Sequence, residues 1–129
     1  MSFAMRWWCI GVMLVGLVLA GAAFVATDLL AVEVLTLFGG GVVPMTAPLR
    51  FAAGLMGAVT FGWGASLLAV AQASVALAPD LRTTLWRRIG WAVLAWYVLD
   101  SAISVATGFW LNAVSNTVLL AWFWWAARR

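Results

Sequence analysis

The sequence predicts an all-α integral membrane protein, a four-helix bundle with a short interfacial helix between its first and second spans. Of its 129 residues, 67% are hydrophobic and 9% are charged, whereas a soluble domain carries about 25% charged residues. Seven basic and four acidic side chains occur, and all but Asp100 lie at the edges of long apolar runs. Such a chain cannot cover its own apolar surface with polar groups, so its main partner is the lipid bilayer. The length allows one transmembrane domain over residues 1–129.

Four apolar stretches are long enough to cross a membrane, which takes about 20 residues for about 30 Å of hydrocarbon. They cover approximately residues 7–27, 51–73, 89–107 and 110–127. Pro48 precedes the second stretch, Pro79 follows it, and Gly108 is the turn that makes the last two a tight antiparallel hairpin. A cleaved signal peptide is the alternative for the first stretch. Its apolar run continues past the cleavage-like Ala20-Gly21-Ala22 to Thr27, and this favours a retained span.

The arginines predict how the chain is oriented. Four crossings place six of the seven on one side of the membrane and Arg50 on the other, together with Asp28 and Glu33. Positive residues concentrate on the cytoplasmic side. We therefore expect both termini in the cytoplasm, a cytoplasmic connector at residues 83–88, and a location in the inner membrane of a bacterium. A chain rich in Ala, Gly and Trp, with Arg but no Lys, is typical of a GC-rich bacterial genome.

The segment between the first two spans is too polar to cross and too apolar to remain in water. Thr27 or Asp28 can cap a helix that ends at Gly39-Gly40-Gly41. We expect this helix to lie in the outer interface of the membrane; a first helix that projects outward is the alternative. Its apolar residues are predicted on one face: Leu30, Val34, Leu37 and Phe38.

Most of the ten tryptophans map to the membrane boundaries, where indole rings prefer the headgroup level. Three map inside the spans: Trp63, Trp91 and Trp96. On the cytoplasmic boundary lie Trp7, Trp8, Trp86, Trp122, Trp124 and Trp125.

Four polar residues of the hairpin form the main candidate site. Counted from Gly108, Asp100 and Asn116 lie at one depth, and Ser104 and Asn112 at another, so two polar stripes face each other. An Asp at a helix centre costs about 2.5–3.5 kcal/mol to insert. Desolvation favours its neutral form, which would donate to the Asn116 carbonyl. We interpret the four as a clasp that locks the hairpin; a polar cavity that binds a proton, a cation or a polar solute is the alternative.

The second span carries small residues at four-residue intervals, which allow another helix to approach closely. Packing within the chain is the first interpretation, and a homodimer or a partner membrane protein is the second. Thr60 and Trp63 are expected near the depth of Asp100. The stripe comprises Gly54, Ala58, Gly62 and Ser66.

The sequence lacks the residues that several classes of function require. Without His, and with Cys9 as the one cysteine, neither a usual metal site nor a Cys-His or Ser-His pair can form. No phosphate-binding glycine motif or basic stripe is present, so we expect no cofactor, no enzyme activity and no nucleic-acid partner.

Over about its last 80 residues, the chain resembles small four-span bacterial inner-membrane proteins catalogued as uncharacterised. The resemblance implies the four-helix layout and no activity. It is carried by Leu49-Arg50-Phe51, Gly54, Gly57, Gly62-Trp63-Gly64, the run from Trp96 through Tyr97, Asp100 and Ser101, and the arm of Gly108, Asn112 and Asn116.

The expected function is that of a non-enzymatic, multi-pass membrane protein of accessory or structural type, with a polar clasp around Asp100. The alternative is a small transporter or channel that uses Asp100 and the Asn residues in a membrane cavity. A water-accessible pocket at Asp100 would favour the alternative.

Overall fold

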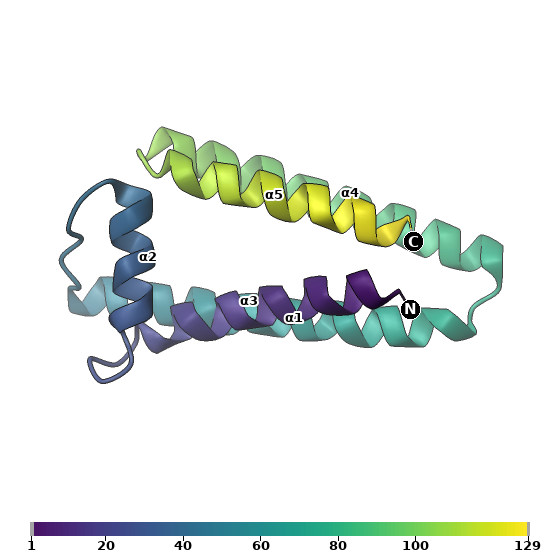
Figure 1. Ribbon diagram of the computed structural model, residues 1–129, viewed down its shortest axis with the longest axis horizontal. Coiled ribbons are helices and arrows are strands. Elements are labelled where there is room, and N and C mark those ends of the chain that lie inside the picture. The colour runs from purple at the N-terminus through teal and green to yellow at the C-terminus, as the bar shows by residue number, and fades with distance from the viewer. Residues whose placement is uncertain (1, 129) are drawn as a thin grey trace. The chain divides into compact units, whose positions relative to one another are not determined.

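The computed structural model describes residues 2–128, and the secondary structure in this part of the chain is helical (Figure 1). The predicted all-α class is therefore confirmed. The elements are α1 (Phe3–Gly21), α2 (Leu29–Gly39), α3 (Ala47–Ala73), the 3₁₀ turn η1 (Ser74–Ala76), α4 (Pro79–Ala106) and α5 (Trp110–Ala127).

The chain divides into two compact units. The first, Cys9–Leu67, contains most of α1, all of α2 and most of α3, and we call it the glycine-packed unit. The second joins the residues up to Trp8 to those from Leu68 onward, and we call it the hairpin unit. That residues 1–129 act as one transmembrane domain stays a prediction.

Three helical segments are long and apolar enough to cross a membrane: Phe3–Gly21, Ala47–Ala76 and Pro79–Ala106. This finding is compatible with a membrane protein. The segment Trp110–Ala127 is not among the three, because its Asn and Trp side chains lower its mean hydropathy. A fourth crossing, by Trp110–Ala127, stays a prediction.

The first helix lies earlier in the sequence than expected, over Phe3–Gly21 rather than residues 7–27. Past Gly21 the chain tightens into i→i+3 hydrogen bonds, from Ala22 N to Leu19 O at 3.0 Å and from Ala23 N to Ala20 O at 3.2 Å. The Thr27 hydroxyl then donates to the Gly21 carbonyl at 2.8 Å. These bonds satisfy carbonyls that a continuing helix would have used, so the chain turns before Asp28.

The short helix α2 forms where it was predicted, and Gly40 in the left-handed conformation ends it at φ 71°. That Leu30, Val34, Leu37 and Phe38 form one apolar face in the outer interface stays a prediction. Ala31 is fully buried, whereas Leu30 and Leu37 are exposed. Asp28 precedes the helix without a side-chain capping bond; its carboxylate pairs instead with Arg50.

The long helices begin earlier than the apolar pattern suggested. The Thr46 hydroxyl accepts from Leu49 N at 3.4 Å and so caps α3. Pro79 occupies the first turn of α4 together with Asp80, both favourable there. Residues 83–88, expected as a connector, are consequently part of α4.

Each unit has its own packing. In the glycine-packed unit, Ala22, Ala31 and Ala53 form a core of small side chains. In the hairpin unit, Trp8 and Phe123 are fully buried with ring centroids 5.3 Å apart, and the Trp8 indole donates to Leu119 O at 2.9 Å. Trp8 is thus a packed residue, and its place at the membrane boundary stays a prediction.

Candidate functional site

The hairpin that holds Asp100 is closed by a glycine. Gly108 has φ 86°, a backbone conformation that residues other than glycine seldom adopt. Gly108 N donates to Val105 O at 3.2 Å, and Phe109 N donates to Ser104 O at 2.8 Å. These are the two bonds of a Schellman motif, which satisfies the last carbonyls of α4. The turn predicted at Gly108 is therefore confirmed, and α5 runs back along α4 (Figure 1).

The structure brings Asp100, Ser104, Asn112 and Asn116 together, and we call these four residues the polar clasp. Asp100 Oδ1 accepts from Asn116 Nδ2 at 2.7 Å and from Asn112 Nδ2 at 2.8 Å. The Ser104 hydroxyl donates to Asp100 O at 2.7 Å and approaches Oδ1 at 3.3 Å. Asn112 Nδ2 also donates to Ser104 Oγ at 2.8 Å. The facing of the two polar stripes, expected from depth counting, is present.

The expected direction of one hydrogen bond is reversed. A neutral Asp100 donating to the Asn116 carbonyl was anticipated, but the Asn116 amide donates to the carboxyl oxygen. With two amides and a hydroxyl directed at Oδ1, the clasp is arranged around an acceptor.

The clasp is covered on one side and open on the other. Asn116 is 4% exposed and Ser104 is 6% exposed, while Asp100 is only partly buried. Among residues 2–128, Asp100 Oδ2 has no hydrogen-bond partner. One carboxyl oxygen is thus occupied by the clasp and the other remains available.

A second polar link across the hairpin was missed. The hydroxyls of Tyr97 and Thr117 lie 3.0 Å apart. Tyr97 is eleven positions from Gly108 and Thr117 is nine. The prediction paired residues at equal distances from the turn, so it did not pair these two. Beside them runs an open, mainly apolar groove of about 670 Å³.

Thr60 and Trp63, expected near Asp100, belong to the glycine-packed unit. The Thr60 hydroxyl donates to Met56 O of its own helix at 2.8 Å. Trp63 is partly buried. Their approach to the polar clasp stays a prediction.

In the predicted stripe of small residues on α3, Gly54 packs against the turn that follows α1, where an added Cβ would lie 2.8 Å from Ala23 Cβ. Ala58 and Ser66 are exposed, and a Cβ on Gly62 would meet nothing within 4 Å. Packing of the whole stripe within the chain stays a prediction. We call Ala58, Gly62 and Ser66 the exposed stripe.

The glycines that pack α1 against α3 are Gly16, Gly57 and Gly64. A Cβ on Gly57 would lie 2.6 Å from Gly16 O and would collide with Ala20 N. A Cβ on Gly16 would lie 2.8 Å from Gly57 O, and one on Gly64 would lie 3.0 Å from Cys9 O. Gly57 and Gly64 are seven residues apart, a spacing that places them on one face of α3. The sequence contained this signal, but the packing was not predicted from it.

The groups around Asp100 are hydrogen-bond donors. Two amides and a hydroxyl are directed at its Oδ1, a set that suits an acceptor oxygen. Within residues 2–128, no three His, Cys, Asp or Glu side chains group as metal ligands.

The chain matches no protein-family model, no curated protein and no solved structure.

Proposed function

We propose that the chain is a non-enzymatic, multi-pass membrane protein of structural or accessory type in a bacterial inner membrane, with both termini in the cytoplasm. Three helices with the length and hydropathy of membrane spans support this placement. The six-to-one distribution of arginines supports the orientation. Because α5 returns along α4 from the turn at Gly108, a membrane crossed by α4 is crossed by α5 too.

The observation that carries the proposal is the double acceptance at Asp100 Oδ1. Two amides of α5 donate to one oxygen of α4, at 2.7 and 2.8 Å. Apolar burial gives helices little reason to associate in lipid, whose tails are as apolar as Leu, so packing and polar bonds decide the pairing. The clasp fixes the register of α4 on α5 and satisfies groups that would be costly in hydrocarbon.

The accessory role rests on the exposed stripe. Ala58, Gly62 and Ser66 leave a shallow face on α3 to which another helix can come close. The proposed partner is a second copy of this chain or a different membrane protein.

One observation favours a second function, that of a small transporter or channel. Asp100 Oδ2 has no partner among the described residues and its side chain is only partly buried. A carboxylate oxygen in a membrane span is a common binding point for a proton or a cation.

Two substitutions at Asp100 separate the two functions. Asp100→Asn retains an acceptor oxygen for the amides but removes the ionisable group. Asp100→Leu removes the acceptor and leaves two amides unsatisfied, which we expect to lower the free energy of unfolding in detergent by about 1–3 kcal/mol. We expect Asp100→Asn to lower it by less than about 1 kcal/mol.

Flux of protons, sodium and potassium into liposomes completes the comparison. Asp80→Asn, on the exposed first turn of α4, is the matched control. An unchanged stability in Asp100→Leu would contradict the clasp. A wild-type flux that disappears in Asp100→Asn, at retained stability, would favour the transporter.

A further inference from the structure

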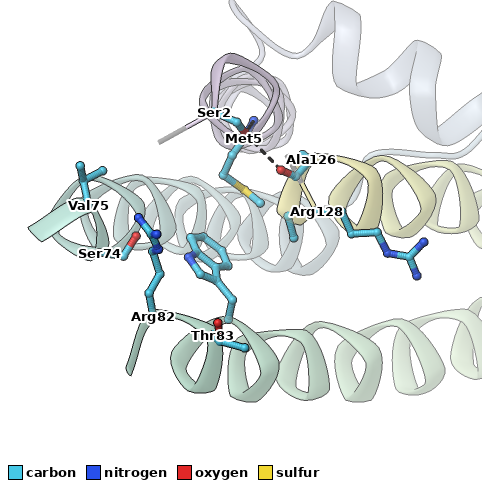
Figure 2. Close-up of a pocket in the computed structure, with 10 residues that line it drawn as sticks. Ser2, Met5, Ser74, Val75, Arg82, Thr83, Ala126 and Arg128 are labelled. Carbon is cyan, nitrogen blue, oxygen red and sulfur yellow. Dashed lines mark hydrogen bonds between the residues drawn. The ribbon is translucent and has the colours of Figure 1, made fainter. Parts of the chain in front are cut away.

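A partly enclosed cavity of about 380 Å³ lies in the hairpin unit, away from the polar clasp (Figure 2). Four segments contribute to it: the start of α1, η1, the first turns of α4 and the end of α5. Its floor includes the buried residues Met5, Ser74 and Ala126. We call it the terminal pocket. Its volume lies in the range of about 300–1,000 Å³ that is usual for small-molecule sites.

The charge of the terminal pocket is positive and unbalanced. Arg82 and Arg128 line it, and no acidic residue does. Among residues 2–128, neither arginine side chain has a hydrogen bond or an ion pair; the one ion pair in this part of the chain joins Arg50 to Asp28. Figure 2 shows Arg82 beside Ser74, whereas Arg128 is directed away from it. Arg82 is therefore the principal cation of the pocket.

The hydroxyl groups of the pocket already donate to backbone carbonyls. Ser2 donates to Ala126 O at 3.1 Å, Ser74 to Ala71 O at 2.9 Å, and Thr83 to Pro79 O at 2.8 Å. The bond of Ser2 joins the start of the described chain to the end of α5, whereas those of Ser74 and Thr83 are local, and none of the three hydroxyls has a proton to spare. Donors for a ligand must come from other groups.

Trp86 supplies a second donor. Its ring lies 6.4 Å from the buried ring of Phe123, centroid to centroid, which fixes its position. Within the described residues its indole N–H has no hydrogen-bond partner. A guanidinium and an indole N–H at the rim of a polar cavity suit an anion with several acceptor oxygens, and the planar guanidinium matches phosphate in particular.

We propose that the terminal pocket binds a phosphate group through Arg82 and Trp86, with Arg128 as an additional cation. The source that fits best is the headgroup of an anionic phospholipid. Phe3–Gly21 begins at this pocket, Ala47–Ala76 ends at it, and Pro79–Ala106 begins at it. If these helices cross the bilayer as proposed, the pocket lies at the headgroup level, where basic pockets bind anionic lipids.

The test uses the full chain purified in a non-ionic detergent, with binding measured by titration of three probes. The probes are dioctanoyl phosphatidylglycerol, dioctanoylglycerol with the same tails and no phosphate, and inorganic phosphate. We expect Arg82→Gln to weaken phosphatidylglycerol binding by about tenfold or more, and Arg82→Lys to restore part of it. Arg88→Gln is the matched control, because Arg88 is an exposed arginine of α4 outside the pocket; we expect less than about a twofold effect there.

Each outcome decides a separate point. Inorganic phosphate that binds as tightly as the lipid, with the same dependence on Arg82, would retain the phosphate site but overturn the lipid as its source. Equal losses in Arg82→Gln and Arg88→Gln, or equal binding of dioctanoylglycerol, would overturn the site itself. Thermal unfolding of each variant checks folding. A failed clasp at Asp100 would leave these results unchanged, since the detergent assay does not use that site.

Discussion

The two units of this chain hold their helices together by opposite means. In the hairpin unit, α4 and α5 are joined by side chains that reach across and exchange hydrogen bonds at Asp100, Asn112 and Asn116. In the glycine-packed unit, α1 and α3 come close because side chains are absent at Gly16 and Gly57. Lipid offers helices little hydrophobic gain from association, which leaves polar bonds and close packing as the sources of affinity between them.

The two means of attachment differ in what they tolerate. A hydrogen bond survives a change to an isosteric acceptor, as Asp100→Asn would show. A backbone contact at Gly57 accepts no additional atom, because the neighbours of an added Cβ are the backbone atoms of Gly16 and Ala20. Backbone cannot move aside as the end of a flexible side chain can.

The largest effect is expected at Gly57. Gly57→Ala adds one methyl group against the backbone of α1 and should destabilise the glycine-packed unit by about 3 kcal/mol, at the upper end for overpacking. Unfolding in detergent, followed by energy transfer between probes on α1 and α3, measures the loss. If Gly57→Ala lowered the free energy of unfolding by less than Asp100→Leu does, the expectation that the glycine contact is the less tolerant of the two would be contradicted.

Gly62→Ala is the matched control for that substitution. An alanine there meets nothing within 4 Å and lies in the same helix, five residues away. Alanine has the higher helix propensity by about 1 kcal/mol, so this variant should equal or exceed the wild type in stability. A loss at Gly62 would mean that the exposed stripe is already covered by a partner in the sample.

The polar clasp could be predicted from the sequence because one turn defines it. Gly108 is the sole turn residue between two apolar runs, and equal distances from a turn give equal depth in an antiparallel pair. Asp100 and Asn116 were paired by this arithmetic. Which of the two side chains donates could not be predicted in the same way, because it depends on the orientation of the Asn116 amide group.

The packing of α3 could not be predicted by spacing alone. Small residues occupy more than one face of this helix: Gly54 and Ala58 lie on one, and Gly57 and Gly64 on another. Periodicity identifies each face but does not say which one α1 contacts. The three-dimensional contacts decide: a Cβ on Gly57 or Gly64 would meet backbone atoms of α1, whereas one on Gly62 would meet nothing within 4 Å.

Helix ends and the terminal pocket depended on contacts distant in sequence. The end of α1 at Gly21 is determined by the Thr27 hydroxyl, which is six residues later. The terminal pocket requires Ser2 beside Ala126, 124 positions apart, and no local pattern predicts that pair. Arg82 was interpreted from the sequence only as an orientation signal.

The smallest effect is expected at the ion pair of the glycine-packed unit. Arg50 Nη1 lies 2.7 Å from Asp28 Oδ2, with side chains 21% and 16% exposed, and it also donates to Ala22 O at 3.2 Å. Asp28→Asn should cost about 1 kcal/mol or less at low salt. Raising the salt concentration should reduce that difference, because ions screen a pair that solvent still reaches. A cost that salt leaves unchanged would show that the pair acts as a buried contact.

Labelling of single cysteines from each side of the membrane tests the central claim, that α4 and α5 form a membrane-crossing hairpin. In a Cys9→Ala background, a membrane-impermeant maleimide is applied to spheroplasts and to inside-out vesicles. The probe sites Thr83→Cys and Arg128→Cys lie at the ends of the hairpin, and Thr107→Cys lies at its turn. We predict that Thr107→Cys is labelled in spheroplasts alone, and that the other two are labelled in inside-out vesicles alone. Labelling of all three from the same side would contradict the account, because the hairpin would then lie along one surface of the membrane.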